Sequence, residues 1–420
     1  MIWTCDVMVI GGGPAGLAAA ISADKEGARV VLVEREARLG GILKQCIHDG
    51  FGLVRYEEKL SGPEYVERFI DEFRSRGIEA KLMTFVTSVE RIKEGFKVTL
   101  VSRDGVEVYE AKSLVLATGC RERTSKQVFI HGTRPSGIFT AGTAQHYTNL
   151  LGQLPTKRCV ILGSGDIGLI MARRLTLEGA EVVGVYEIKN TPSGLTRNIH
   201  QCLNDFNIPL HLSHTVTRVF GMDRLEAVEV AKVDEHLKPI PGTEEKIECD
   251  ALILSVGLIP ENELAETLEV RIDNRTKGPI CDSNLMTNIP GIFACGNALH
   301  VNDLVDYVSE SGEIAGKNAA HFKRAENKSV IEIVPSETLL YVVPQSLNLN
   351  GYINDFVMYF RSNRIYENCI FRLKIDGRTV FEKRYPIVRP PEMERVVVNL
   401  KGINLRATTV VRAEIVRDEE

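Results

Sequence analysis

Two glycine-rich segments, each directly after an apolar run, constrain this chain more than any other feature. The first, GGGPAG, follows CDVMVI and places Gly11, Gly13 and Gly16 at the spacing GxGxxG. In a strand-turn-helix unit the first glycine permits the tight turn, the second lets the backbone approach a pyrophosphate, and the third lets helix and strand pack closely. Glu34 closes the next apolar run, where a carboxylate accepts hydrogen bonds from a ribose. Residues 5–34 are therefore expected to form a βαβ unit that binds a dinucleotide.

The second segment, GSGDIG, follows the apolar run RCVIL and repeats the spacing at Gly163, Gly165 and Gly168. A glycine turn that only permits close packing is the alternative interpretation. Glu187 closes the next strand-like run, and its carboxylate would accept from a free 2′-hydroxyl and repel a 2′-phosphate. The position favours NAD(H) over NADP(H), although Lys189 nearby keeps NADP(H) open.

Length and composition indicate an ordinary folded protein. The 420 residues are enough for about three domains. The 51 basic and 56 acidic residues are interspersed, which excludes the basic stripe of a nucleic-acid-binding protein. No uninterrupted apolar stretch reaches the length of a membrane-spanning helix, and the first residues lack the basic region of a signal peptide. Nine scattered cysteines, never spaced CxxC, favour a cytoplasmic location with reduced thiols.

The last part of the chain has a different character. Only three of the 35 glycines (Gly351, Gly377 and Gly402) follow residue 329. Short strand-like runs such as LLYVV, DFVMYF and CIFRLKI, separated by turn signals, predict a β-sandwich of six or seven strands over 330–420.

Between these regions the pattern predicts further elements. Apolar spacing predicts a helix over 61–77, followed by a small antiparallel meander that ends with GVEVYEAK. SLVLATG is expected to form a separate apolar strand. Residues 121–156 are turn-rich and are interpreted as a crossing between domains. The segment 303–322 predicts a helix with small residues on one side.

Four motifs follow one another along the chain in an order that is specific to one kind of protein. GGGPAG with Glu34, LATG at 116–119, GSGDIG with Glu187 and GIFACGN at 291–297 resemble flavoproteins with two dinucleotide-binding domains, related to the pyridine nucleotide-disulfide reductases. The likeness covers about residues 5–322. It implies an α/β fold with two Rossmann-like, glutathione-reductase-type domains, to which the C-terminal all-β sandwich-like domain is added. The implied domains are a discontinuous FAD-binding domain (1–150 and 286–329), an NAD(H)-binding domain (151–285) and the β-sandwich (330–420).

The resemblance implies FAD at the first glycine site and NAD(H) at the second. Asn297 stands where the family normally has an Asp that bonds the ribityl chain, and an amide there can still donate and accept. Gly40 and Gly41 resemble the loop beneath the flavin. The expected cofactor-binding residues are Gly11, Gly13, Pro14, Ala15, Gly16, Glu34, Arg35, Gly40, Gly41, Ile42, Val86, Thr118, Gly119, Gly163, Gly165, Asp166, Ile167, Glu187, Gly257, Gly296, Asn297 and Val305.

A narrower likeness lies in the strings GGILKQCIHDGFG, SGPEYVERF and CGNALHVNDLVDYVSESGEIAG, taken with the β-rich tail. They resemble the single-chain oxidoreductases that accompany glycerol-3-phosphate dehydrogenase-like flavoproteins in bacteria. This resemblance implies that the partner is a second flavoprotein dehydrogenase subunit, that the chain forms a homo- or hetero-oligomer, and that it has a role in glycerol-3-phosphate oxidation.

Disulfide chemistry needs two closely spaced cysteines, and the sequence offers no such pair. Cys46 alone follows the Gly40–Gly41 loop, either as a single redox thiol or as a packed, unreactive side chain. Hydride transfer between nicotinamide and flavin needs no protein acid or base, so no catalytic residue is expected. No metal-ligand set is expected either.

Some polar residues in turn-rich segments could approach a cofactor. His48, His131 and His300 could lie near the flavin or serve as structural hydrogen-bonding groups. Arg121 and Arg123 could reach a nucleotide phosphate or form ion pairs.

The sequence thus favours an FAD-dependent NAD(P)H oxidoreductase that passes electrons between its flavin and a second substrate or flavoprotein partner. One alternative is an NADH oxidase or a single-cysteine small-molecule disulfide reductase. Another is a nucleotide-binding assembly subunit whose β-sandwich recruits a partner.

Overall fold

The computed structural model describes residues 2–323, 329–349, 355–403 and 405–418. The chain forms two compact units. The first comprises Met1–Lys44, Asp49–Cys120 and Pro260–Glu420, and the second comprises Gln45–His48 and Arg121–Ile259. The domain limits expected from the sequence stay a prediction.

A parallel sheet forms the centre of the first unit. Its five parallel strands follow the order β5 (Glu79–Lys81), β2 (Val30–Val33), β1 (Ile2–Ile10), β8 (Gly105–Leu116) and β20 (Ile292–Ala294). All of β2 and β20 and the second half of β1 are buried. Such near-continuous apolar runs are typical of strands covered on both faces.

Strand β8 is longer than the sequence pattern indicates. We expected GVEVYEAK and SLVLATG to form two strands, and that prediction is wrong because the backbone stays extended through Lys112 and Ser113. The first half of β8 pairs antiparallel with β7 (Gly95–Ser102), which pairs with β6 (Phe85–Ile92). The second half pairs with β20. The hydroxyl of Ser113, buried at the junction, donates to the Ala319 carbonyl at 2.9 Å.

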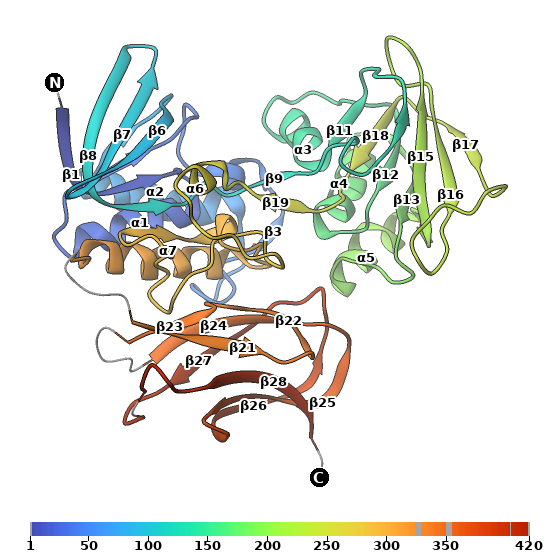
Figure 1. Ribbon diagram of the computed structural model, residues 1–420. Coiled ribbons are helices and arrows are strands. Elements are labelled where there is room, and N and C mark those ends of the chain that lie inside the picture. The colour runs from blue at the N-terminus through green and yellow to red at the C-terminus, as the bar shows by residue number, and fades with distance from the viewer. Residues whose placement is uncertain (1, 324–328, 350–354, 404, 419–420) are drawn as a thin grey trace. The chain divides into compact units, whose positions relative to one another are not determined.

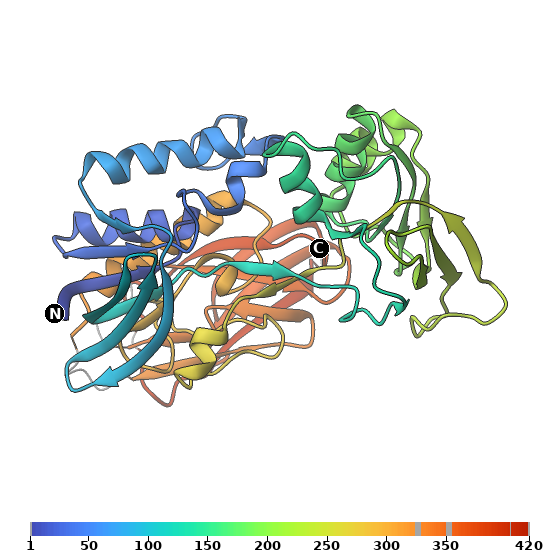
Figure 2. The ribbon, with the colours of Figure 1, turned by 90° about the horizontal axis from the view of Figure 1, so that it is seen from above.

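Three helices accompany this sheet: α1 (Pro14–Lys25), α2 (Gly62–Ser75) and α7 (Val305–Ala320). Helix α2 begins at a capping box between Ser61 and Glu64. Helices α1 and α7 lie side by side (Figures 1 and 2). A Cβ at Gly312 or Gly316 of α7 would lie 2.2 or 2.0 Å from an α1 carbonyl oxygen, so these glycines permit the close approach.

Short elements complete this part of the chain. They are η1 (Gly41–Gln45), β3 (Asp49–Phe51), β4 (Leu60–Ser61), α6 (Glu263–Thr267) and η3 (Gly296–Ala298). The strands β9 (Cys120–Glu122) and β19 (Leu258–Pro260) lie where the chain passes from one unit's residues to the other's.

The C-terminal residues form two sheets that face each other. Met358 and Phe360 of one sheet and Phe371 of the other belong to the same buried core. We expected six or seven strands, whereas the described residues hold eight, because VIEIVP and SLN also pair. One sheet has the order β23 (Ser346–Asn348), β21 (Val330–Pro335), β28 (Val411–Arg417), β25 (Tyr366–Ile375) and β26 (Arg378–Val388); the other has the order β22 (Leu339–Val343), β24 (Asp355–Ser362) and β27 (Glu394–Asn399).

The second unit has its own five-stranded parallel sheet. Its order is β11 (Ile138–Thr140), β18 (Ala251–Leu254), β12 (Arg158–Leu162), β13 (Glu181–Glu187) and β14 (Leu210–Leu212). Its helices are α4 (Asp166–Leu177) and α5 (Thr196–Cys202), with η2 (Asn204–Phe206). A second sheet contains β10 (His131–Gly132), β15 (His214–Phe220), β16 (Ala227–Lys232) and β17 (Glu245–Glu248).

Part of the segment interpreted as a turn-rich crossing is helical. Helix α3 (Ala141–Asn149) begins after Thr140, whose side chain accepts a hydrogen bond from Thr143 N. Its buried face consists mainly of small residues such as Ala141 and Ala144, so the apolar periodicity that marks a helix is weak.

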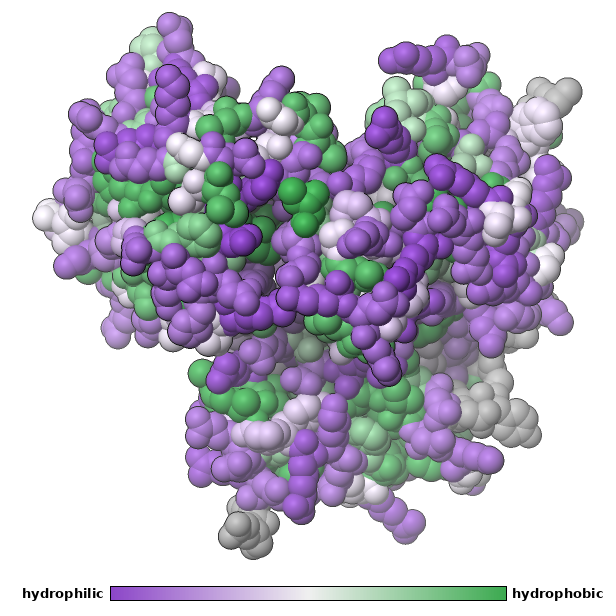
Figure 3. Space-filling view, turned by 180° about the vertical axis from the view of Figure 1, so that it is seen from behind, coloured by the Kyte–Doolittle hydropathy of each residue, from purple (hydrophilic) through white to green (hydrophobic). Residues whose placement is uncertain are grey.

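Large apolar residues on the surface are scattered. The face in Figure 3 shows them as small groups among hydrophilic residues. Within the described ranges, every helix is too short or too polar to cross a membrane.

Candidate functional site

The first glycine turn joins β1 to α1. Gly11 has a φ of +110°, and a Cβ there would lie 2.3 Å from the Ala117 carbonyl oxygen. A Cβ at Gly16 would lie 1.8 Å from the Gly11 carbonyl oxygen. Both positions therefore require glycine, and the turn lies tightly against the segment that follows β8.

The amino end of α1 can accept an anion. Gly13 precedes the helix without a side-chain cap, and the first turn carries no acidic side chain. A Cβ at Gly13 would have its nearest neighbour, Gly41 Cα, at 3.9 Å, so this position has room. Pro14 supplies a preset φ, and buried Ala15 packs beneath the turn. Unpaired N–H groups and the helix dipole favour a phosphate here.

Glu34 lies directly after β2 and is buried. Its carboxylate accepts hydrogen bonds from Gly12 N at 2.7 Å and from Glu36 N at 2.8 Å. The side chain therefore fixes the glycine turn, and each carboxylate oxygen keeps capacity for a hydroxyl group such as that of a ribose.

A second glycine pair forms the other wall of this turn. Gly40 N donates to the Gly12 carbonyl oxygen at 2.8 Å, and a Cβ at Gly41 would lie 2.9 Å from Gly13 Cα. Ile42, the next residue, is exposed. The structure thus brings together the two glycine segments that the sequence separates.

Arg35 directly follows Glu34 in the chain and forms an ion pair with Glu261 at 3.0 Å. The hydrogen bond that Arg35 donates to this carboxylate raises the pKa of the arginine. Thr118 Oγ1 donates to the Glu261 carbonyl oxygen at 2.6 Å, and Glu261 N donates to the Gly119 carbonyl oxygen at 3.0 Å. Three predicted residues therefore meet at Glu261, which the sequence did not single out.

Asn297 lies in η3, which follows β20. Its side-chain oxygen accepts from Asn302 N at 3.0 Å and from Asn302 Nδ2 at 3.3 Å, and its Nδ2 donates to Cys120 Sγ at 3.6 Å. Gly296 has a φ of +61°, and its N–H donates to Ser311 Oγ at 2.8 Å. The loop therefore holds the Asn297 side chain in one orientation.

Two more predicted residues, Val86 and Val305, lie at or next to the first position of a strand or helix. Val86 is the second residue of β6; just before that strand, Thr84 N donates to the Glu34 carbonyl oxygen at 3.0 Å. Val305 begins α7, and the next residue, Asp306, is buried with Oδ2 unpaired. The buried Oδ1 of Asn302 is also unpaired. Two orphaned acceptors, one in the loop and one in the first turn of α7, are consistent with a ligand that supplies donors.

The second glycine turn lies in the second unit, between β12 and α4. Gly163 has a φ of +99°, and a Cβ there would lie 2.0 Å from the Ser255 carbonyl oxygen. A Cβ at Gly168 would lie 2.6 Å from the Gly163 carbonyl oxygen. Gly165 has room, with its nearest neighbour at 3.6 Å. The geometry repeats that of the first turn.

Glu187 ends β13 and is buried. Its Oε2 accepts from Ser164 N at 3.0 Å and from Ser164 Oγ at 2.6 Å. Its Oε1 accepts from Lys189 N at 3.1 Å. The backbone of Lys189 is therefore engaged with the carboxylate that the sequence associated with a ribose.

The first turn of α4 carries an acidic side chain, unlike that of α1. Asp166 Oδ1 accepts from Leu195 N at 2.9 Å and from Asn198 Nδ2 at 2.6 Å. Ile167, the next residue, packs against the unit's core. Gly257 has a φ of +99° and open space around a Cβ, and its carbonyl accepts from Arg123 N at 3.2 Å.

No disulfide joins the cysteines of the described residues. Burial raises the pKa of the Cys46 thiol to about 12, and its sulfur lies 3.9 Å from Gln145 Oε1. A thiol with such a pKa is not a thiolate at neutral pH, so this environment favours the packed, unreactive interpretation.

The remaining candidates lie in different surroundings. His131 and Arg121 are exposed and His48 is half-buried. His300 is buried, with ring centroids 5.2 Å from Tyr359 and 6.1 Å from Tyr341. It therefore faces the C-terminal β-strands. The sequence reasoning also missed Gly12, Ser164 and Ser311, since their roles depend on backbone approach that no motif encodes.

A chain with two glycine turns, each closed by a buried carboxylate at the end of a parallel strand, belongs to the class of proteins with two dinucleotide-binding domains. The profile of the pyridine nucleotide-disulphide oxidoreductase family matches residues 5–325. The chain belongs to this family.

Curated relatives share only part of their length with this chain. Dihydrolipoyl dehydrogenase, mitochondrial, of Caenorhabditis elegans is 27% identical over 346 residues, which cover 73% of this chain and 66% of the relative. Hydrogen cyanide synthase subunit HcnB of Pseudomonas protegens is 29% identical over 289 residues, which cover 62% of this chain and 58% of the relative. The chain thus matches less than two thirds of each protein.

Solved structures share the fold. The thioredoxin reductase of Lactococcus lactis in its FR conformation superposes with a TM-score of 0.62 at 22% identity, covering 76% of this chain and 98% of that chain. The predicted fold class, α/β with two Rossmann-like domains and a C-terminal all-β domain, is confirmed.

The family is one of oxidoreductases, and FAD and NAD(P)H are the cofactors typical of it, in agreement with the cofactors expected from the sequence. The first turn fits a resident FAD, since it combines an uncapped helix end without acidic residues, room at Gly13 and orphaned acceptors at Asn302 and Asp306. The second turn fits a nucleotide held through Glu187.

Proposed function

We propose that the chain binds FAD on its first unit and NAD(H) on its second, and that it transfers electrons between NAD(H) and a second flavoprotein subunit. The observation that carries the proposal is the pair of glycine turns, each with a buried carboxylate, in a chain whose cysteines are widely spaced in the sequence and form no disulfide among the described residues. Bound flavin would supply the ring that exchanges hydride with nicotinamide.

The chain's own residues bind and orient the two nucleotides. The amino end of α1 would hold the FAD pyrophosphate, and Glu34 would accept from the adenosine ribose. Gly40 and Gly41 would let the backbone approach the flavin, and Asn297 would contact the ribityl chain. The other residues that we propose for FAD are Gly11, Gly13, Pro14, Ala15, Gly16, Arg35, Ile42, Val86, Thr118, Gly119, Gly296 and Val305.

The second turn supports NAD(H) over NADP(H). Glu187 is buried and anchored by three donors, so its charge stays beside the ribose position, where it would repel a 2′-phosphate. The residues that we propose for NAD(H) are Gly163, Gly165, Asp166, Ile167, Glu187 and Gly257.

An electron-transfer partner fits better than disulfide chemistry. The thiol of Cys46, the one cysteine that follows the Gly40–Gly41 loop, has a strongly raised pKa, which disfavours a thiol mechanism. The relative from Pseudomonas protegens is named as one subunit of a synthase, which supports a partner protein here. A role in glycerol-3-phosphate oxidation and a cytoplasmic location stay proposals that rest on the sequence.

Anaerobic reduction tests the proposal. Purified protein should carry a yellow chromophore, NADH should bleach it faster than NADPH, and a Cys46→Ser variant should be reduced at an unchanged rate. Affinity purification of the native protein should return a flavoprotein dehydrogenase. Colourless protein that does not take up FAD, or flavin that NADH does not bleach, would falsify the proposal.

A further inference from the structure

The smaller C-terminal sheet presents two tyrosine-arginine pairs on its outer face. Tyr341 of β22 lies opposite Arg361 of β24, and Tyr359 of β24 lies opposite Arg395 of β27. The alternate residues of β24, such as Phe360, point into the sandwich core. Because side chains alternate along a strand, the two pairs share the face that points away from the core.

Each tyrosine-arginine pair binds one carboxylate outside the β-sandwich, either Asp303 or Glu310. Arg361 forms an ion pair with Asp303 and donates from Nε to Tyr341 Oη at 2.8 Å. Arg395 donates from Nε to Glu310 Oε2 at 2.8 Å and forms an ion pair with the same carboxylate, and Tyr359 Oη donates to Glu310 Oε2 at 2.7 Å. Glu310 lies within α7, whereas Asp303 lies in the loop that precedes it.

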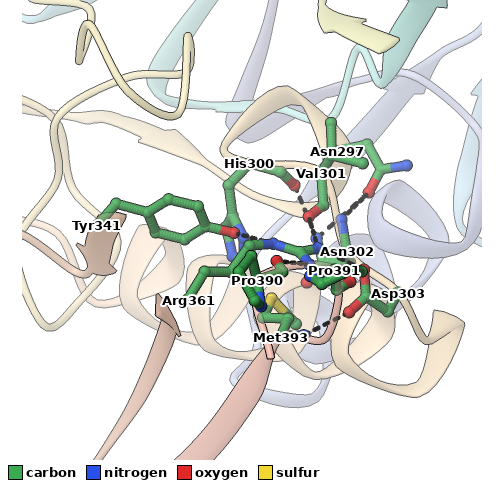
Figure 4. A network of polar contacts seen from close by, with 10 residues as sticks. All are labelled: Asn297, His300, Val301, Asn302, Asp303, Tyr341, Arg361, Pro390, Pro391 and Met393. Atoms are coloured by element: carbon green, nitrogen blue, oxygen red, sulfur yellow. Dashed lines mark hydrogen bonds and ion pairs between the residues drawn. The ribbon is translucent and has the colours of Figure 1, made fainter. Parts of the chain in front are cut away.

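The loop with Asp303 also contains Asn297. Arg361 lies within reach of the Val301 carbonyl oxygen at 3.5 Å, and Asp303 Oδ2 accepts from Met393 N at 2.5 Å. The next residue back, Asn302, donates to the Asn297 side-chain oxygen from both of its nitrogens. Figure 4 shows this continuous path from Arg361 through the loop to Asn297.

The side chain of Arg361 is largely buried. The arginine side chain is 13% exposed and its Nη1 donates to the carbonyls of Pro390 and Pro391. His300 fills the space beside it, with both ring nitrogens unpaired. In such surroundings a charged hydrogen bond is strong and the loss of one partner is costly.

We propose that Arg361 is a positioning residue for the flavin, which fixes the 297–305 loop so that Asn297 faces the cofactor; this inference rests on the proposed function. The C-terminal sandwich is then a constituent of the flavin site. Arg395 offers a matched control, because it makes the same kind of contact on α7 without touching the loop.

The test uses the full chain after its flavin has been removed. FAD is titrated back while flavin fluorescence is measured, and visible circular dichroism is recorded at saturation. Arg361→Gln should weaken FAD binding about tenfold and alter the circular dichroism of the bound flavin. Arg361→Lys, which keeps the charge, should recover part of both. Arg395→Gln should bind FAD within about twofold of the parent chain, even if it melts at a lower temperature.

A second variant protects the test against misfolding. Asp303→Asn should weaken FAD binding in the same direction as Arg361→Gln, and the double variant should lose less than the sum of the two single effects, because both remove the Arg361–Asp303 ion pair. The inference is overturned if both single variants keep the parent's affinity and spectrum, or if Arg395→Gln weakens FAD binding equally. A parent chain that does not take up FAD overturns the proposed function itself.

Discussion

The two glycine turns share a plan and differ in what surrounds them. In both, a buried glutamate at the end of the next strand accepts from the backbone N–H after the first glycine: Glu34 from Gly12 and Glu187 from Ser164. The first turn lies against backbone on two sides, the Ala117 carbonyl and the Gly40–Gly41 pair. The second turn also lies against one backbone carbonyl, that of Ser255, but in place of a second backbone wall it has side-chain contacts, from the Ser164 hydroxyl and the Asp166 carboxylate.

This difference matches two kinds of ligand. Backbone walls change little on binding and suit a cofactor that stays bound, whereas side-chain hydrogen bonds can be exchanged for those of a nucleotide that comes and goes. The comparison predicts that damage to the first turn removes the flavin, and that damage to the second turn changes only the affinity for nicotinamide nucleotide.

Paired glycine substitutions provide the largest expected contrast. Gly16→Ala places a Cβ 1.8 Å from the Gly11 carbonyl oxygen and should weaken FAD binding by about 100-fold or more. Gly168→Ala, with its closest approach at 2.6 Å, should leave the flavin bound and raise the KM for NADH. Flavin content by absorbance and steady-state kinetics measure both; a yellow Gly16→Ala protein would contradict the comparison.

Acid should affect the first unit through His300. Burial, with a contribution from Arg361, lowers the pKa of His300 from its ordinary value of 6.5 to about 3. The unfolded chain therefore binds a proton below pH 6.5 that the folded chain refuses, so stability falls by about 1.4 kcal/mol per pH unit between these values. His300→Phe should remove that slope from chemical unfolding of the first unit, monitored by flavin release. An unchanged slope would show that His300 is not neutral and buried in solution.

The carboxylates should separate the two nucleotides. Glu187→Gln removes the charge that would repel a 2′-phosphate and should reduce the preference for NADH over NADPH about tenfold. Glu34→Gln should leave this preference unchanged and lower the affinity for FAD instead. Ratios of kcat/KM for the two coenzymes measure the first effect. If both variants changed the coenzyme preference and the FAD affinity equally, the two turns would not be specialised for different nucleotides.

The smallest effect is expected at Asn297. Asn297→Asp keeps the oxygen that accepts from Asn302 and loses only the donor to Cys120 Sγ, a weak acceptor. FAD affinity should change by less than about threefold, and NADH affinity should not change. Flavin titration checks both values. A larger loss would mean that the amide donor contacts the cofactor directly.

Sequence patterns predicted those elements that depend on interactions between residues close together in the chain. The α1 turn and the α2 capping box each depend on residues within one βαβ unit or one helix end. Helix α3 was missed because its buried face consists mainly of small side chains, which give only a weak apolar periodicity. The merging of two expected strands into β8 depends on β1, which is remote in sequence and pairs with both halves of β8.

The candidate site shows the same limit. Spacing alone identified Gly11, Gly163 and the two glutamates, because the turn geometry follows from them. Sequence reasoning could not place Glu261 beside Arg35 and Thr118, or Arg361 beside Asp303, because such pairs form only when separate elements pack.

The long strand β8 has a consequence for synthesis of the chain. Its second half stays without its β20 neighbour, and α1 stays without α7, until the whole second unit has been translated. At ordinary elongation rates this interval lasts on the order of ten seconds or more. Nascent chains would therefore expose, during this interval, the face of α1 that α7 later covers.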